Sequence, residues 1–146
     1  MPHSYSPAQW TLRIFLLLAP SGAALAQAPV ITSVVPLANA RAAACTSPLT
    51  VSFSQPLTAA SVGALKVFSS QKGGLRSRST TPASVSGSTL SFTPSASAFM
   101  PGETVQYTVT TAAGNSGGTL ARPRVAQFTT AAGGTGIGAF QFGSDV

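Results

Sequence analysis

The sequence predicts an all-β sandwich of about seven strands, and three observations lead to this prediction. From Pro29 onward, short segments that alternate apolar and polar residues are separated by turns rich in Gly, Pro and Ser. No stretch of ten or more residues there carries the i, i+3, i+4, i+7 apolar pattern of an amphipathic helix. Only 7% of the 146 residues are charged and 44% are hydrophobic, and a domain of this length buries enough surface to fold without metal ions or disulfides.

Four of the expected strands have one buried face, because their apolar side chains occupy every second position; they are Leu49–Phe53, Leu65–Val67, Leu90–Phe92 and Val105–Val109. In chain order the expected strands are Ile31–Val35, Leu49–Phe53, Leu65–Val67, Leu90–Phe92, Val105–Val109 and Arg124–Thr130, with one or two weaker strands within 72–86. Turn residues separate them at Pro48, Pro56, Gly73-Gly74, Gly87, Pro94, Pro101-Gly102 and Gly114–Gly118. Breaks at such regular intervals are typical of a sandwich.

The N-terminal segment, residues 1–26, is interpreted as a secretory signal peptide. Arg13 precedes a short apolar run that Pro20 interrupts, and small residues then lead up to Ala26. Cleavage is expected after Ala26, with Ala28 as the alternative site. An uncleaved anchor is the weaker alternative, since a membrane span needs about 20 apolar residues. The mature chain is therefore expected to have no transmembrane segment and to be secreted or displayed at the cell surface.

The side chains left after cleavage exclude most kinds of catalysis. The mature chain has no His and no Trp, and seven Lys and Arg residues less two acidic residues give a formal charge of +5. Without an imidazole, Ser-His-Asp and Cys-His catalysis lack their proton acceptor. Glu103 beside a turn and Asp145 in the tail do not make the carboxylate pair of a glycosidase. Calcium and zinc sites lack their ligand sets, so we expect no enzyme, no cofactor and no metal. A Ser-Lys dyad on Lys66 or Lys72 is the one catalytic arrangement that residue counting leaves open.

Six basic residues form a candidate surface for an anionic ligand. Arg76 and Arg78 lie two positions apart, as do Arg122 and Arg124, so each pair projects from one face of an extended chain. The full candidate set is Lys66, Lys72, Arg76, Arg78, Arg122 and Arg124. Such a surface would attract anionic polysaccharide or lipopolysaccharide in a salt-sensitive way. The alternative is that these cations are only solvated, because the chain has few anions. No aromatic residue for base stacking flanks the arginines, so no specific nucleic-acid binding is expected.

Cys45 is the single cysteine, and it has three open interpretations. It is an inert thiol in a stretch of small residues, one half of a disulfide to another chain or to a missing segment, or a reactive thiol. Aromatic candidates for sugar contact are few: Phe68, whose alternative is partial burial, and Phe140 and Phe142 of the tail. Tyr107 is assigned to the core face of its strand. The Gly-rich segment 132–146 is interpreted as a linker or tail.

Five segments together resemble the bacterial Ig-like domains of the surface-layer type. They are Val30–Pro36, Leu49–Leu57, Gly87–Pro94, Met100–Thr104 and Gln127–Thr130. Where that family commonly has an aromatic residue, three positions after the Gly of its Pro-Gly motif, this chain has Val105, with Tyr107 two positions later. The resemblance implies an Ig-like β-sandwich at residues 29–131 that is non-catalytic and serves as a structural spacer or adhesive module.

The tail adds a second, smaller resemblance. Gly138-Ala139-Phe140 is similar to the lead-in of FG-GAP-type repeats, which implies neighbouring domains in a larger surface protein. A binding module for anionic glycans or lipopolysaccharide is the alternative function, and it depends on the six basic residues.

Overall fold

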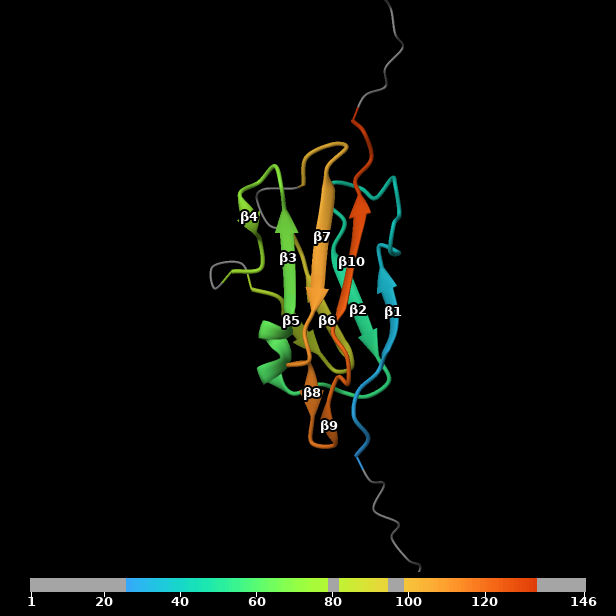
Figure 1. Cartoon of the computed structure of the whole chain (residues 1–146), viewed down its shortest axis with the longest axis vertical. Helices are drawn as coiled ribbons and strands as arrows, with labels where there is room; N and C mark the ends of the chain where they lie inside the picture. Colours follow the sequence, from blue (N-terminus) through green and yellow to red (C-terminus); the bar gives the residue numbers. More distant parts are fainter. Residues whose placement is uncertain (1–25, 79–81, 95–98, 134–146) are drawn as a thin grey trace, which may run out of the picture.

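The computed structural model describes residues 26–78, 82–94 and 99–133, and it contains two antiparallel sheets packed face to face (Figure 1). The first sheet has the order β1 (Ile31–Val35), β2 (Leu49–Phe53), β6 (Thr89–Phe92) and β5 (Ser84–Ser86). The second has the order β10 (Arg124–Thr129), β7 (Thr104–Val109), β3 (Leu65–Ser69) and β4 (Gly74–Leu75). This strand order is that of an Ig-like sandwich, so the predicted fold class is confirmed.

The core lies between the sheets and is built by alternate residues of each strand. Its inward side chains include Val34, Leu49, Val51, Phe53, Leu90 and Phe92 from the first sheet, and Leu65, Val67, Val105, Tyr107, Val109 and Phe128 from the second. Phe99, from the connection before β7, joins the two layers. Its ring centroid lies 6.4 Å from that of Phe92 and 5.9 Å from that of Phe128, the latter edge to face.

Two small elements at the lower end of the sandwich, as drawn in Figure 1, were not expected from the sequence. A 3-10 helix, η1 (Ala59–Ala64), precedes β3, and the Gly-rich stretch predicted as a turn forms a hairpin of β8 (Gly114–Asn115) and β9 (Gly118–Thr119). The buried hydroxyl of Ser61 joins them, because it donates to the Gly114 carbonyl and accepts from the Gly114 N–H, each at 3.0 Å. Elements this short carry no apolar period and leave no alternating signal.

The chain changes sheets soon after β1. β1 pairs with β2, but after Pro36 the segment 39–43 lies along β10 of the other sheet, and Asn39 turns the backbone with a φ of 63°. Four backbone hydrogen bonds of 2.7 to 3.1 Å hold this segment parallel to the second half of β10. They run from Asn39 N–H to Gln127 O, Thr129 N–H to Ala40 O, Ala43 N–H to Thr129 O and Ala131 N–H to Ala43 O. Segment 39–43 does not reach the first half of β10.

The described chain starts at one pole of the sandwich and leaves at the other (Figure 1). Residue 26 lies at the lower pole beside the β8–β9 hairpin, and residue 133 lies beyond the upper end of β10. The expected signal peptide, 1–26, lies outside the described residues except for its last position. The expected linker, 132–146, lies outside them from residue 134 onward.

Candidate functional site

The six candidate basic residues divide into two groups at opposite edges of one sheet. Lys66, Lys72, Arg76 and Arg78 belong to β3, β4 and their flanks, whereas Arg122 and Arg124 belong to the start of β10, at the other end of the order β10-β7-β3-β4. The structure therefore does not bring all six together. We call the first group the β4 basic edge.

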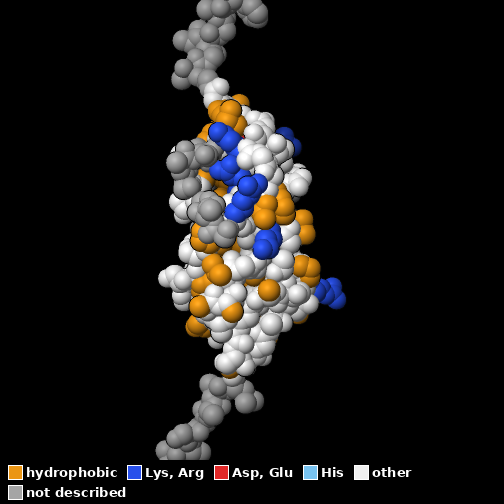
Figure 2. Space-filling model, turned by 90° about the vertical axis from the view of Figure 1, so that its left-hand side faces the viewer, with side chains coloured by type: hydrophobic (Ala, Val, Ile, Leu, Met, Phe, Trp, Pro, Cys, Tyr) orange, Lys and Arg blue, Asp and Glu red, His pale blue; other side chains and the backbone are white. Residues whose placement is uncertain are grey.

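The β4 basic edge is a continuous stripe of positive charge. Figure 2 shows the molecule from the side of β4. Lys and Arg side chains (blue) lie one below another in the upper half of this face, and no Asp or Glu side chain (red) is visible among them. The turn carbonyls hold two of the guanidinium groups: Arg76 Nη1 donates to Lys72 O at 3.0 Å, and Arg78 donates to Leu75 O at 2.7 Å and to Gly73 O at 2.9 Å. Local backbone contacts thus keep these charges at the edge, and no acidic side chain is exposed among the residues that the structure describes.

The carboxylate of Glu103 lies behind this edge, fully buried. Its Oε1 accepts from the Ser69 hydroxyl and from the Gln71 N–H (3.1 Å), and its Oε2 accepts from the Met100 N–H at 2.8 Å. Burial on its own raises the pKa of Glu103, but these hydrogen bonds and the charge of Arg76 favour the ionised form, and together they lower the pKa below its usual value. Glu103 thus joins the β3–β4 turn to the turn before β7.

The placement of Glu103 gives it a structural role that sequence reasoning missed. The sequence suggested a turn residue and a poor glycosidase candidate. In the fold its side chain is 0% exposed, and its backbone N–H is also bound, by the Thr130 hydroxyl at 2.9 Å. Asp145, the other acidic residue, lies outside the described residues. No local pattern marks Glu103, because Ser69 and Gln71 are more than thirty positions away.

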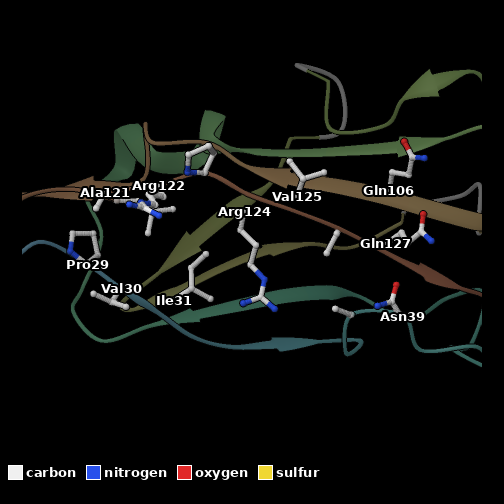
Figure 3. A pocket seen from close by; sticks show the side chains of 14 residues that line it. Pro29, Val30, Ile31, Asn39, Gln106, Ala121, Arg122, Arg124, Val125 and Gln127 are labelled. Carbon is white, nitrogen blue, oxygen red and sulfur yellow. The ribbon is translucent and has the colours of Figure 1, made fainter.

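A groove of about 960 Å³ opens on the other edge, between β1 and the first half of β10. Its walls are largely apolar and include Val30, Ile31, Leu120 and Val125, and Arg122 and Arg124 stand at it. Figure 3 shows the Arg124 side chain reaching from β10 across the groove toward β1, while Val125 points the other way. We call this feature the β10 groove.

The backbone of β10 is also exposed at the groove. The Gln127 carbonyl and the Thr129 N–H point away from β7, since both bind segment 39–43. Backbone groups alternate along a strand, so the N–H and C=O of Val125 point the same way. Within the described part of the chain, neither they nor the Gln127 N–H have a hydrogen-bond partner. The groove therefore combines an open strand edge, apolar walls and two arginines.

The remaining sequence candidates do not assemble into a site. Phe68 is 39% exposed on the outer face of β3, and Tyr107 is fully buried as expected. Cys45 is a half-buried free thiol, and its backbone carbonyl accepts from the Phe99 N–H at 2.9 Å. Among the residues described, neither Lys66 nor Lys72 hydrogen-bonds a serine through its side chain. Phe140 and Phe142 lie outside the described residues.

The described ranges, 26–78, 82–94 and 99–133, contain neither a metal-ligand cluster nor a membrane-spanning helix. They contain no group of three or more His, Cys, Asp or Glu side chains placed to hold a metal ion. No helix among them is both long and apolar enough to span a membrane.

One comparison with known proteins finds a match. The sequence model of a family described as bacterial Ig-like domain matches residues 26–130. This range contains every strand of the sandwich. No curated protein is similar enough to the chain to count as a match.

Proposed function

The chain belongs to the bacterial Ig-like domain family, and on that premise we propose that it is a non-catalytic spacer module of a secreted or cell-surface protein. The observation that carries this proposal is the position of the two ends of the domain. Residues 26 and 133 lie at opposite poles (Figure 1), so a domain inserted here separates its neighbours by its full length. A module whose two ends lie close together would add little distance between its neighbours.

The internal contacts support a stiff spacer. Segment 39–43, close to the start of the domain, is bonded directly to β10 at its end. The Glu103 contacts fix the turns at the upper pole, and the Ser61 contacts fix the hairpin at the lower pole. Both ends of the sandwich are therefore held by buried hydrogen bonds, and the core between them is continuous.

The N-terminal sequence supports export. The apolar run, the Arg13 flank and the small residues before Ala26 have the order of a secretory signal. The family match begins at residue 26, which leaves that run outside the domain. We therefore propose that the domain acts outside the cytoplasm, in a surface protein that includes neighbouring domains.

An exchange of the domain tests the spacer role. In the source bacterium, residues 29–131, which lie after both expected cleavage sites, are deleted in one strain and replaced in another by an unrelated β-sandwich whose ends also lie at opposite poles. An epitope placed after residue 133 reports surface accessibility on intact cells. We expect the deletion to lower antibody binding and the unrelated sandwich to restore it. Failure of the unrelated sandwich to restore it contradicts a spacer role.

The β4 basic edge supports a second candidate function, the binding of anionic glycan or lipopolysaccharide. Four cations stand together there with no exposed carboxylate among the described residues. We expect the full chain to be retained on a heparin column and released by salt. Arg76→Ala with Arg78→Ala should shorten retention more than Arg122→Ala with Arg124→Ala, which removes the same charge elsewhere. Equal retention of both double variants, or equal retention on a neutral glycan column, contradicts this function.

A further inference from the structure

We infer that the β10 groove binds an extended acidic peptide strand of another protein, which adds to the open edge of β10. This interaction is separate from the spacer role, and it does not use the β4 basic edge. The free backbone groups, the apolar walls and the charge of the groove each suit such a peptide.

The backbone supplies a ready template for a strand. The Val125 N–H, the Val125 C=O and the Gln127 N–H point into the groove with no partner among the described residues. Segment 39–43 already occupies the rest of this edge and runs parallel to β10. A peptide in the groove continues the same line of pairing, at the usual separation of about 4.8 Å from β10. Addition to a free sheet edge is a common way for a protein to hold an extended peptide.

The walls of the groove suit the alternating side chains of such a strand. Ile31 and Leu120 line the side toward the core, and Val125, which is 73% exposed, lies on the outer face. Val30 is 58% exposed at the lower end. Exposed apolar side chains that lie together on a protein surface often mark an interaction site. The apolar residues of the peptide would cover Val125, and the residues that alternate with them would face Arg124, which points the other way (Figure 3).

The charge of the groove selects an acidic partner. Arg122 and Arg124 are two positions apart, with Pro123 between them, so their spacing matches carboxylates at alternate positions of a paired strand. The one carboxylate in the described residues is Glu103, which is buried and hydrogen-bonded elsewhere. A second copy of this chain is a poor occupant, because edge-to-edge pairing would bring these arginines against their own copies.

A binding experiment with a defined probe tests the inference. The full chain, labelled with ¹⁵N, is mixed with a capped peptide that alternates Glu and Val, at about 0.15 M salt to screen general attraction. Amide hydrogen exchange is then measured residue by residue. We expect binding to slow exchange at Val125 and Gln127 by at least about tenfold, and to leave Ala126, which already pairs with β7, unchanged. A peptide with Lys in place of Glu should not bind.

Variants separate strand addition from simple charge attraction. Arg122→Ala with Arg124→Ala should weaken binding at least about tenfold, whereas Arg76→Ala with Arg78→Ala should change it less than about threefold. Val125→Pro removes the N–H of an edge position, where proline is tolerated, and should abolish the protection of Gln127. Val125→Thr keeps the N–H and should retain binding.

Several results would overturn the inference. Absence of binding by the Glu-Val peptide does so directly. An equal loss in the two double arginine variants shows general attraction to a basic domain. A change in the NMR signals of the arginine side chains, without slower amide hydrogen exchange at Val125, would show that the peptide binds but does not add as a strand. Heparin bound more tightly than the peptide, with the same dependence on Arg122 and Arg124, assigns the groove to a glycan instead.

Discussion

Glu103, the residue before β7, and Tyr107, in the middle of that strand, both bring a polar group into the interior of the sandwich. Both side chains are 0% exposed. The Glu103 carboxylate accepts three hydrogen bonds, while the Tyr107 hydroxyl has no partner within the residues that the structure describes. The Glu103 carboxylate joins segments that are distant in the sequence. The Tyr107 hydroxyl belongs to a ring that packs in the core. Burial of a polar group therefore does not by itself reveal a structural role.

The largest effect is expected from Glu103→Ala. The change leaves the buried Ser69 hydroxyl and the part-buried N–H groups of Gln71 and Met100 without their acceptor. Each such group costs about 1–3 kcal/mol, so we expect a loss of roughly 3–5 kcal/mol in the free energy of unfolding. Urea denaturation of the full chain measures it. A loss below about 1 kcal/mol would show that the carboxylate does not hold the upper pole.

Glu103→Gln should give a smaller loss that depends on pH. The lowered pKa of Glu103 means that its stabilisation is complete above the ordinary glutamate pKa and is lost as pH falls through the lower pKa in the folded state. At neutral pH we expect Glu103→Gln to cost about 2 kcal/mol, and the difference from wild type should shrink in acid. Denaturation from about pH 7 to about pH 2 measures it.

The matched control for this pH series is Tyr107→Phe, which keeps Glu103. It should show the same acid dependence as wild type. Asp145 is the only other acidic side chain of the sequence, so an acid slope that persists in Glu103→Gln would contradict the assignment to Glu103.

Ser69→Ala removes a donor and keeps the carboxylate. Its hydroxyl donates to Glu103 and accepts from the Lys72 N–H at 2.8 Å. We expect a loss of about 1–2 kcal/mol, and we expect the double variant with Glu103→Ala to be less destabilised than the sum of the two. A double-mutant cycle measures this coupling. Additive losses would mean that the two side chains act independently.

Tyr107→Phe is expected to have the smallest effect, and in the opposite direction. Removal of a buried hydroxyl that has no partner relieves a desolvation cost, while the packed ring remains. We expect no change or a gain of up to about 1 kcal/mol in the free energy of unfolding. Urea denaturation with wild type in parallel is the measurement. A loss of more than about 1 kcal/mol would place a hydrogen bond on this hydroxyl and remove the contrast with Glu103.

The strands were predictable from sequence because their signal is local. Apolar residues at alternate positions indicated β2, β6 and β7 within a residue of their observed ends. Segment 39–43 carries no such alternation, and its pairing with β10 depends on a change of sheet that only the assembled fold shows. The spacing of the arginines placed each pair on one face. It did not give the order of the strands, which separates the two pairs.

The pairing of segment 39–43 with β10 has a mechanical consequence. The two run parallel, and one is tied to the lower pole through β1 while the other leads out at the upper pole. Tension applied between the poles makes them slide past each other instead of peeling apart. The four hydrogen bonds between them then resist together, whereas a hairpin pulled from its open end loses its bonds one by one. A sandwich with this connectivity extends under tension only when all four hydrogen bonds break together.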